Sequence, residues 1–137
     1  MNSIVLFVTI AAAVLVIVKA EDDHDHSEEL KQIEAACEKE TGVDFDLITK
    51  AEKGHFEEGN DLKCFPKCVF EKAKWMNAAG KIDEAAMIAA AEEKGDKDVR
   101  VPIVKKCMKK EGKDACETAY LVYRCYWEEI TAAGLKK

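Results

Sequence analysis

The sequence lacks the alternating apolar and polar runs, bounded by turn residues, that are typical of β-strands. It also lacks an Asn-x-Ser/Thr triplet, so N-glycosylation is not expected. Serine is nearly absent, because Ser27 is the only serine beyond residue 20. These absences argue against a β fold and against a serine nucleophile, and apolar residues instead recur at the three- and four-residue spacings of helices.

Histidine is scarce as well, with three in the chain. His55 stands in the segment HFEEGN, which has neither an adjacent cysteine nor the calcium-binding glycine loop that small phospholipases combine with a His–Asp pair. No other grouping of acid, base and nucleophile is evident. We therefore predict that the protein is not an enzyme and needs no cofactor.

The chain has one long apolar run, at its beginning. Residues 4–18 are apolar except for Thr9, and the run ends in Val18-Lys19-Ala20, with small residues before a cleavage point. A membrane anchor would need roughly 20 apolar residues, and an acidic segment follows at once. We predict a signal peptide over residues 1–20 and a secreted, extracellular domain over residues 21–137.

Acidic residues outnumber basic residues in this predicted domain. Beyond residue 20 the chain has 20 Lys and Arg against 27 Asp and Glu, a net charge of −7. Such a surface argues against nucleic acid and anionic membranes as partners. No other segment approaches the length of a membrane span, so stable membrane insertion is not expected.

Six helices are predicted from the apolar periodicity, from acidic residues at the helix starts and from glycines at the helix ends. They cover residues 27–39, 44–53, 61–79, 83–94, 98–110 and 114–133. The predicted fold class is all-α, a compact bundle of six helices.

All six cysteines lie beyond residue 20, and an even number in a secreted chain predicts three disulfides. Cys64 and Cys68 would lie one turn apart on one helical face, so a bond between them would distort the backbone. Cys116 and Cys125 would lie on opposite faces of the last helix and cannot bond to each other either. These two exclusions leave about ten of the fifteen possible pairings open.

The segment KCFPKCV (63–69) resembles, at first sight, half of a metal or redox site. A zinc site would need free thiolates and more ligands at short spacing, and a redox pair would have two intervening residues rather than three. We interpret its two cysteines as structural, each holding a different neighbouring helix, and predict no metal site.

The cysteine spacing is Cys37-x26-Cys64-x3-Cys68-x38-Cys107-x8-Cys116-x8-Cys125. Together with CEKETGVDFDLI at the first cysteine and KDACETAYLVYRCYW around the last two, this pattern resembles the six-cysteine insect odorant-binding proteins, the pheromone-binding and general-odorant-binding family. The resemblance covers essentially the whole chain beyond residue 20.

The resemblance implies a helical bundle around an internal apolar cavity. It also implies three interlocked disulfides, pairing the first cysteine with the third, the second with the fifth and the fourth with the sixth. In this chain the implied pairs are Cys37–Cys68, Cys64–Cys116 and Cys107–Cys125.

Apolar helix faces can fill a core or line a cavity, and the residues alone do not separate the two. The resemblance favours a cavity, and tyrosines could orient a ligand with a hydroxyl at the end of an apolar ring. The residues predicted to contact the ligand are Val69, Ala73, Met76, Met87, Ile88, Val104, Met108, Tyr120, Tyr123 and Trp127.

The resemblance implies a carrier of small hydrophobic molecules, such as odorants or pheromones, in sensillar lymph or another body fluid. Its partners would be the hydrophobic ligand and an olfactory receptor, and we expect a monomer or weak homodimer. Two alternatives remain open: a helical signalling or toxin-like protein that acts through its surface, and a general carrier outside olfaction.

Overall fold

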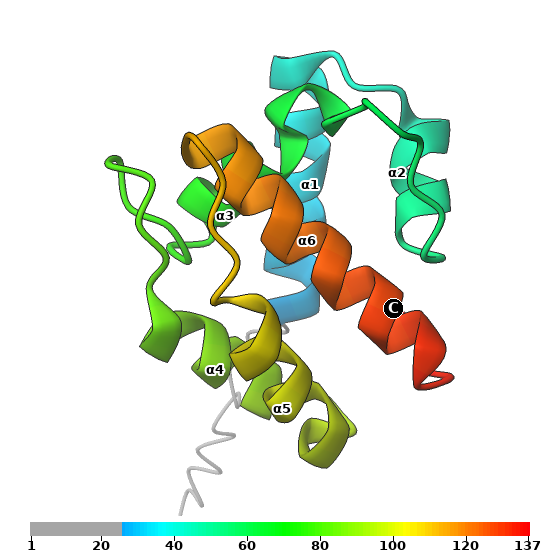
Figure 1. The fold of residues 1–137 in the computed structure, drawn as a ribbon, viewed down its shortest axis with the longest axis vertical. Helices are drawn as coiled ribbons and strands as arrows, with labels where there is room; N and C mark the ends of the chain where they lie inside the picture. Colours follow the sequence, from blue (N-terminus) through cyan, green and yellow to red (C-terminus); the bar gives the residue numbers. More distant parts are fainter. Residues whose placement is uncertain (1–25) are drawn as a thin grey trace, which may run out of the picture.

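The structure is a computed structural model that describes residues 26–137, so the predicted signal peptide at residues 1–20 lies outside the described residues. The described chain forms six α-helices and one short helical turn, with no strand (Figure 1). In chain order they are α1 (His26–Thr41), α2 (Phe45–Ala51), η1 (Leu62–Cys64), α3 (Phe65–Lys72), α4 (Glu84–Glu93), α5 (Lys97–Cys107) and α6 (Ala115–Ala132). The all-α prediction is confirmed.

Three of the helices begin at an aspartate whose side chain caps them. The carboxylates of Asp44, Asp83 and Asp114 each accept a hydrogen bond from a backbone N–H two or three residues further along, at 2.8–3.0 Å. A carboxylate here satisfies an otherwise unpaired donor and interacts favourably with the positive end of the helix dipole. The predicted starts of α2, α4 and α6 are therefore correct to within one residue.

Helix α6 forms the centre of the bundle. It crosses the molecule diagonally in Figure 1 and packs against α3 and α5, while α4 packs against α5 and α1 against α3. Ala119, Val122 and Ile130 of α6 are almost completely buried. Among the described residues, no helix is long and apolar enough to cross a membrane.

Three disulfides connect these helices. They are Cys37–Cys68, Cys64–Cys116 and Cys107–Cys125, the pairs that the resemblance implies. Their loops overlap along the chain, so α1 is linked to α3, α6 to the turn before α3, and α6 to α5. Each disulfide is expected to stabilise the fold by about 2–4 kcal/mol.

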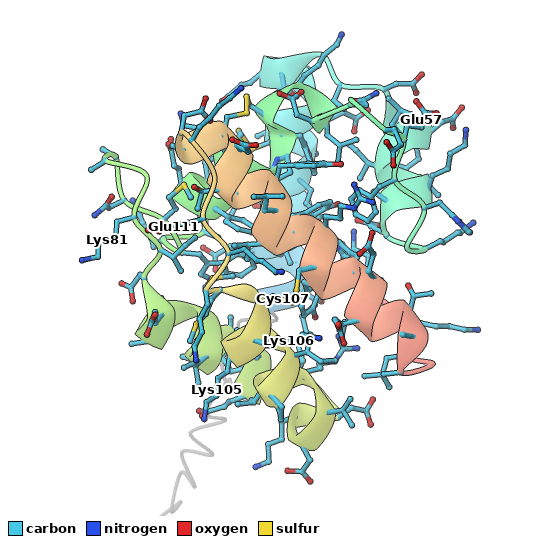
Figure 2. The ribbon with its side chains drawn as sticks, in the orientation of Figure 1. Glu57, Lys81, Lys105, Lys106, Cys107 and Glu111 are labelled. Atoms are coloured by element: carbon cyan, nitrogen blue, oxygen red, sulfur yellow. A yellow bond between two sulfur atoms is a disulfide. The ribbon has the colours of Figure 1, made fainter. Side chains whose placement is uncertain are left out.

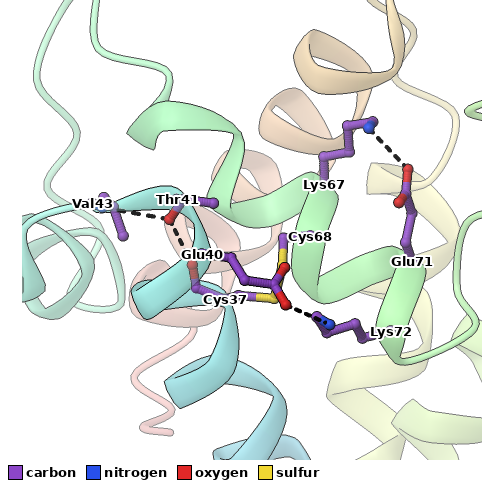
Figure 3. Close-up of a disulfide and its surroundings, with 8 residues drawn as sticks. All are labelled: Cys37, Glu40, Thr41, Val43, Lys67, Cys68, Glu71 and Lys72. Carbon is purple, nitrogen blue, oxygen red and sulfur yellow. Dashed lines mark hydrogen bonds and ion pairs between the residues drawn. A yellow bond between two sulfur atoms is a disulfide. The ribbon is translucent and has the colours of Figure 1, made fainter.

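The Cys37–Cys68 bond lies beside an ion pair that joins the same two helices (Figure 3). Lys72 of α3 pairs with Glu40 of α1 at 2.9 Å. At the end of α1, the hydroxyl of Thr41 donates to the Cys37 carbonyl at 2.6 Å. The ion pair is partly exposed and worth little by itself, so the disulfide and the apolar contacts dominate this junction.

On α5, exposed charged positions and buried positions alternate along the helix. Lys105 extends from the outer side of the helix (Figure 2). Lys106 is exposed but reaches α6, where its ammonium pairs with Glu129 at 2.5 Å, and Cys107 is buried and bonds to Cys125 of α6. Val104 and Met108 are buried on the same inner side.

The third predicted helix, residues 61–79, is wrong at both ends. At its start, Leu62, Lys63 and Cys64 all have positive φ, between 52° and 60°, and form a left-handed turn. Regular helix begins only at Phe65, with Pro66 in its first turn, where a missing N–H costs no hydrogen bond. Cys64 therefore does not share a helical face with Cys68.

At its other end the helix stops at Lys72, seven residues before the predicted end. Lys74 has φ 64°, and the Trp75 N–H bonds the Phe70 carbonyl at 2.8 Å, which is a Schellman termination. Glycine normally occupies the left-handed position of this motif. A lysine stands there in this chain, which is why the sequence pattern did not reveal the end.

Candidate ligand pocket

A pocket of about 280 Å³ lies between α1 and α2. Phe65, the first residue of α3, and Lys137 also line it. The volume lies just below the range for small-molecule sites, roughly 300–1,000 Å³. The pocket is therefore suited to a small ligand.

Helical spacing determines which side chains of α1 and α2 line the pocket. On each helix the lining positions recur about every third or fourth residue and share one face. In chain order they are Lys31, Glu34, Ala35 and Glu38 from α1, and Phe45, Ile48 and the capping residue Glu52 from α2.

The pocket combines an apolar floor with a charged rim. Phe65 and Ile48 are 1% and 5% exposed and form the floor, whereas Phe45 at the edge is 61% exposed. An exposed aromatic ring is costly to hydrate, so the edge of the pocket offers apolar area that a ligand can cover.

The rim contains a three-residue ionic cluster. The Lys137 ammonium donates to Glu34 at 2.8 Å and to Glu52 at 2.5 Å. Burial lowers the pKa of Lys137, but the hydrogen bonds to the two carboxylates outweigh burial and raise its pKa overall. Burial is also the main reason that the pKa of Glu52 is raised, although Lys137 lowers it.

The end of α6 brings Lys137 to this position. Gly134 has φ 73°, and the Leu135 N–H bonds the Ile130 carbonyl at 3.1 Å, so the helix ends in a Schellman motif. Leu135 packs against the core, and the Lys136 carbonyl accepts a hydrogen bond from Arg100 at 2.8 Å. The backbone before Lys137 is therefore held on both sides.

Arg100 is the buried charge behind this segment, with 6% exposure. Its guanidinium donates to the carbonyls of Gly95 and Lys136 and to the Tyr126 hydroxyl, at 2.8–3.0 Å. Among residues 26–137, no carboxylate lies within ion-pair distance of Arg100. Three hydrogen bonds to neutral acceptors thus stabilise it in place of a counter-ion.

Tyr123 has a polar atom without a partner. Its side chain is 7% exposed, and its hydroxyl makes no hydrogen bond within the described part of the chain. Burial raises its pKa well above the ordinary value, and the charges of Glu52 and Glu34 raise it further. The Trp127 indole opposes this shift, without a hydrogen bond of normal geometry.

An aromatic cluster connects the pocket floor to Tyr123. The Phe65 and Tyr123 rings meet edge-on at 6.4 Å between centroids, and Tyr123 meets Trp127 in the same way at 6.3 Å. Such edge contacts stabilise by about 0.5–1.5 kcal/mol beyond area burial. The floor of the pocket is thus one side of this cluster.

None of the ten residues predicted to contact a ligand lines this pocket. Seven of them are buried, and Ala73, Ile88 and Tyr120 are partly buried. All but Ala73 belong to the core or pack against it. Ala73 and Met76 do not continue the third helix as predicted, because that helix ends at Lys72.

Sequence reasoning missed the lining residues of α1 and α2. Phe45, Ile48 and Glu52 have helical spacing, but a helix as short as α2 has too few positions for a clear apolar face. The role of Lys137 has no local signal at all, because its partners lie 103 and 85 residues away in the chain.

Asp61, Cys64 and Cys116 are the one group of potential metal ligands in the described residues. Both sulfurs belong to one disulfide, so neither can bind a metal as a thiolate. We therefore interpret this group as part of the disulfide junction.

The chain is similar in sequence to odorant-binding proteins of two insect species. It is 27% identical over 111 residues to general odorant-binding protein 69a of Drosophila melanogaster, covering 74% of each chain. It is 25% identical to general odorant-binding protein 19d of the same species over 122 residues, covering 85% of this chain and 79% of that protein. Odorant-binding protein 22 of Aedes aegypti is 23% identical over 129 residues, covering 91% and 94%.

The fold is also shared with a solved structure. Odorant-binding protein OBP28a of Drosophila melanogaster superposes with a TM-score of 0.63 at 21% identity, covering 83% of this chain and 99% of that one. The family model described as the PBP/GOBP family matches residues 19–129. The chain therefore belongs to the PBP/GOBP family.

Proposed function

We propose that the protein is a secreted carrier that binds small hydrophobic ligands, odorants or pheromones, and delivers them to membrane receptors. Membership of the PBP/GOBP family and the names of the relatives support this proposal. The structural observation that carries it is the pocket between α1 and α2, with Ile48 and Phe65 as its buried apolar floor.

The physical basis of the carrier function is solubilisation. An apolar ligand in the pocket exchanges water for apolar side chains, which stabilises the complex by about 25 cal/mol for each Å² buried. The exposed ring of Phe45 would lose contact with water in the same step. A small pocket limits this gain, so we expect reversible binding, as a carrier requires.

Some of the residues that the sequence predicts to contact the ligand lie behind the floor of the pocket. Phe65 separates the pocket from Tyr123 and Trp127. A ligand that displaces the Phe65 ring would reach Tyr123 first, whose hydroxyl has no partner. We propose that the predicted residues contact larger ligands in this way.

The remaining parts of the proposal follow from the same function. The protein would act outside the cell without catalysis, as a monomer or weak homodimer. Its partners would be the ligand and an olfactory receptor.

Displacement of an environment-sensitive fluorescent probe tests the proposal. The delipidated protein at neutral pH should take up the probe, and small apolar compounds should displace it. Phe45→Ser should weaken probe uptake, because Phe45 lines the pocket. The matched control is Val99→Ser, which alters the other large exposed apolar side chain, on α5 and away from the pocket. No uptake across a broad compound panel would overturn the carrier function.

A further inference from the structure

An ammonium group already occupies the rim of the pocket. Lys137 Nζ lies between the carboxylates of Glu34 and Glu52, which come from two different helices, and all three residues line the pocket. The side chain of a lysine is an alkyl chain that ends in a primary ammonium. The chain itself thus shows which chemical group this part of the pocket accepts.

The two glutamate side chains are more deeply buried than the lysine side chain between them. The side chains of Glu34 and Glu52 are 19% and 16% exposed, whereas that of Lys137 is 41% exposed. Lys137 can therefore leave toward solvent while the two acids keep their positions. Their charges would then need another cation.

The rest of the rim also favours a positive charge. Three glutamates and two lysines line the pocket. One of these lysines, Lys31, pairs with Glu28 outside the pocket lining at 2.8 Å. Glu38 makes no side-chain hydrogen bond or ion pair with any residue in the described range 26–137. When Lys137 moves out, the acids on the rim outnumber the bases by three to one.

We propose that the pocket binds amphipathic primary amines, with the ligand ammonium replacing the Lys137 ammonium between Glu34 and Glu52 and the apolar part lying on Phe45, Ile48 and Phe65. This inference rests on the proposed carrier function and specifies its ligand class.

The exchange keeps the paired charges and adds apolar burial. Release of Lys137 alone would leave two mostly buried carboxylates without its hydrogen bonds, so the ligand ammonium has to take its place in the same step. The ligand forms the same pair of charge-assisted hydrogen bonds and also covers apolar surface that the lysine leaves exposed. An ammonium has three N–H donors, and Lys137 uses two of them on the glutamates.

Calorimetric titration with octylamine, octanol and octanoate tests the inference, because these compounds share one alkyl chain and differ in the charge of the head group. The wild-type protein should bind octylamine more tightly than octanol, and octanoate most weakly. Added salt should weaken octylamine binding and leave octanol binding unchanged. This salt comparison uses the unaltered protein and so does not depend on any variant folding.

Three variants then locate the amine site. Lys137→Met should tighten octylamine binding by about fivefold, because the competing ammonium is gone. Lys136→Met is the matched control, since it removes the neighbouring charge while only the backbone carbonyl of Lys136 takes part in a contact. The double variant Glu34→Gln with Glu52→Gln should weaken octylamine binding by about tenfold more than it weakens octanol binding.

The outcomes separate the inference from the proposed function. Octanol binding without a preference for octylamine would overturn the amine inference alone. An amine preference that survives both glutamine substitutions would do the same, by placing the ammonium elsewhere. If none of the three compounds binds, the carrier function fails together with the inference.

Discussion

Arg100 donates a 2.8 Å hydrogen bond to the hydroxyl of Tyr126, although the arginine is 6% exposed and the two residues are 26 positions apart. The bond joins α5 to α6 near the backbone segment that leads to Lys137. A buried guanidinium depends on each such acceptor, because charged groups lose much hydration on burial. Loss of this contact should therefore cost more stability than loss of a hydrogen bond between two neutral, exposed groups.

Tyr126→Phe should destabilise the protein by about 1–3 kcal/mol, because it leaves a buried guanidinium N–H without an acceptor. Urea unfolding with and without the substitution measures this difference. Tyr120→Phe is the matched control, since the hydroxyl of Tyr120 lies beside the more exposed Arg124. If both variants lost the same free energy of unfolding, the burial of Arg100 would not be the reason for the loss in Tyr126→Phe.

Tyr123→Phe should stabilise the ligand-free protein, whereas Tyr126→Phe should destabilise it. Its hydroxyl is buried without a hydrogen bond, so removing the oxygen removes a desolvation penalty and should stabilise by up to about 1 kcal/mol. Thermal unfolding of the ligand-free variant measures the gain. A clear loss of stability would show that the hydroxyl has a partner in solution.

The stability should depend on pH through Glu52. Burial raises its pKa above the ordinary value of about 4.5, so the folded state binds the proton more tightly than the unfolded state. The stabilisation from protonated Glu52 is complete below pH about 4.5 and is lost as the pH rises through the higher folded pKa.

Glu52→Gln removes this contribution and provides the measurement. Wild type should gain stability relative to Glu52→Gln as the pH falls from about 7 toward 4, in urea unfolding at a series of pH values. The charges acting on Glu52 are Lys137, Glu34 and Lys94, so the same series with Lys137→Met should show a steeper dependence. A difference that does not change with pH would contradict the assigned shift.

Two Schellman motifs allow a matched backbone test. Lys74 after α3 and Gly134 after α6 occupy the same left-handed position, with φ 64° and 73°. Lys74→Gly should stabilise the protein by about 1 kcal/mol, and Gly134→Ala should destabilise it by a similar amount. No atom lies within 4 Å of a β-carbon built at Gly134, so the second effect isolates the backbone.

Unfolding in urea measures both Schellman substitutions under the same conditions. If Lys74→Gly lowered the stability, the strain at Lys74 would be smaller than the entropy that glycine adds to the unfolded chain, and the expected gain would be wrong.

The helix caps show which helix ends can be predicted from nearby residues alone. Three aspartates predict the starts of α2, α4 and α6, because a capping carboxylate acts within two or three residues of its own position. The helix that ends at Lys72 escaped prediction, because a lysine adopts the conformation that usually needs glycine.

By itself the sequence determined the all-α class and the starts of α2, α4 and α6, since periodicity and capping are local. The cysteine spacing indicated the family and with it the disulfide pairs. Only the tertiary structure decided that the pocket lies between α1 and α2 and that Lys137 closes an ion pair with Glu34 and Glu52. These residues are far apart in the chain. Their meeting depends on how α6 ends, on the hydrogen bond from Arg100 to Lys136, and on the packing of the whole bundle.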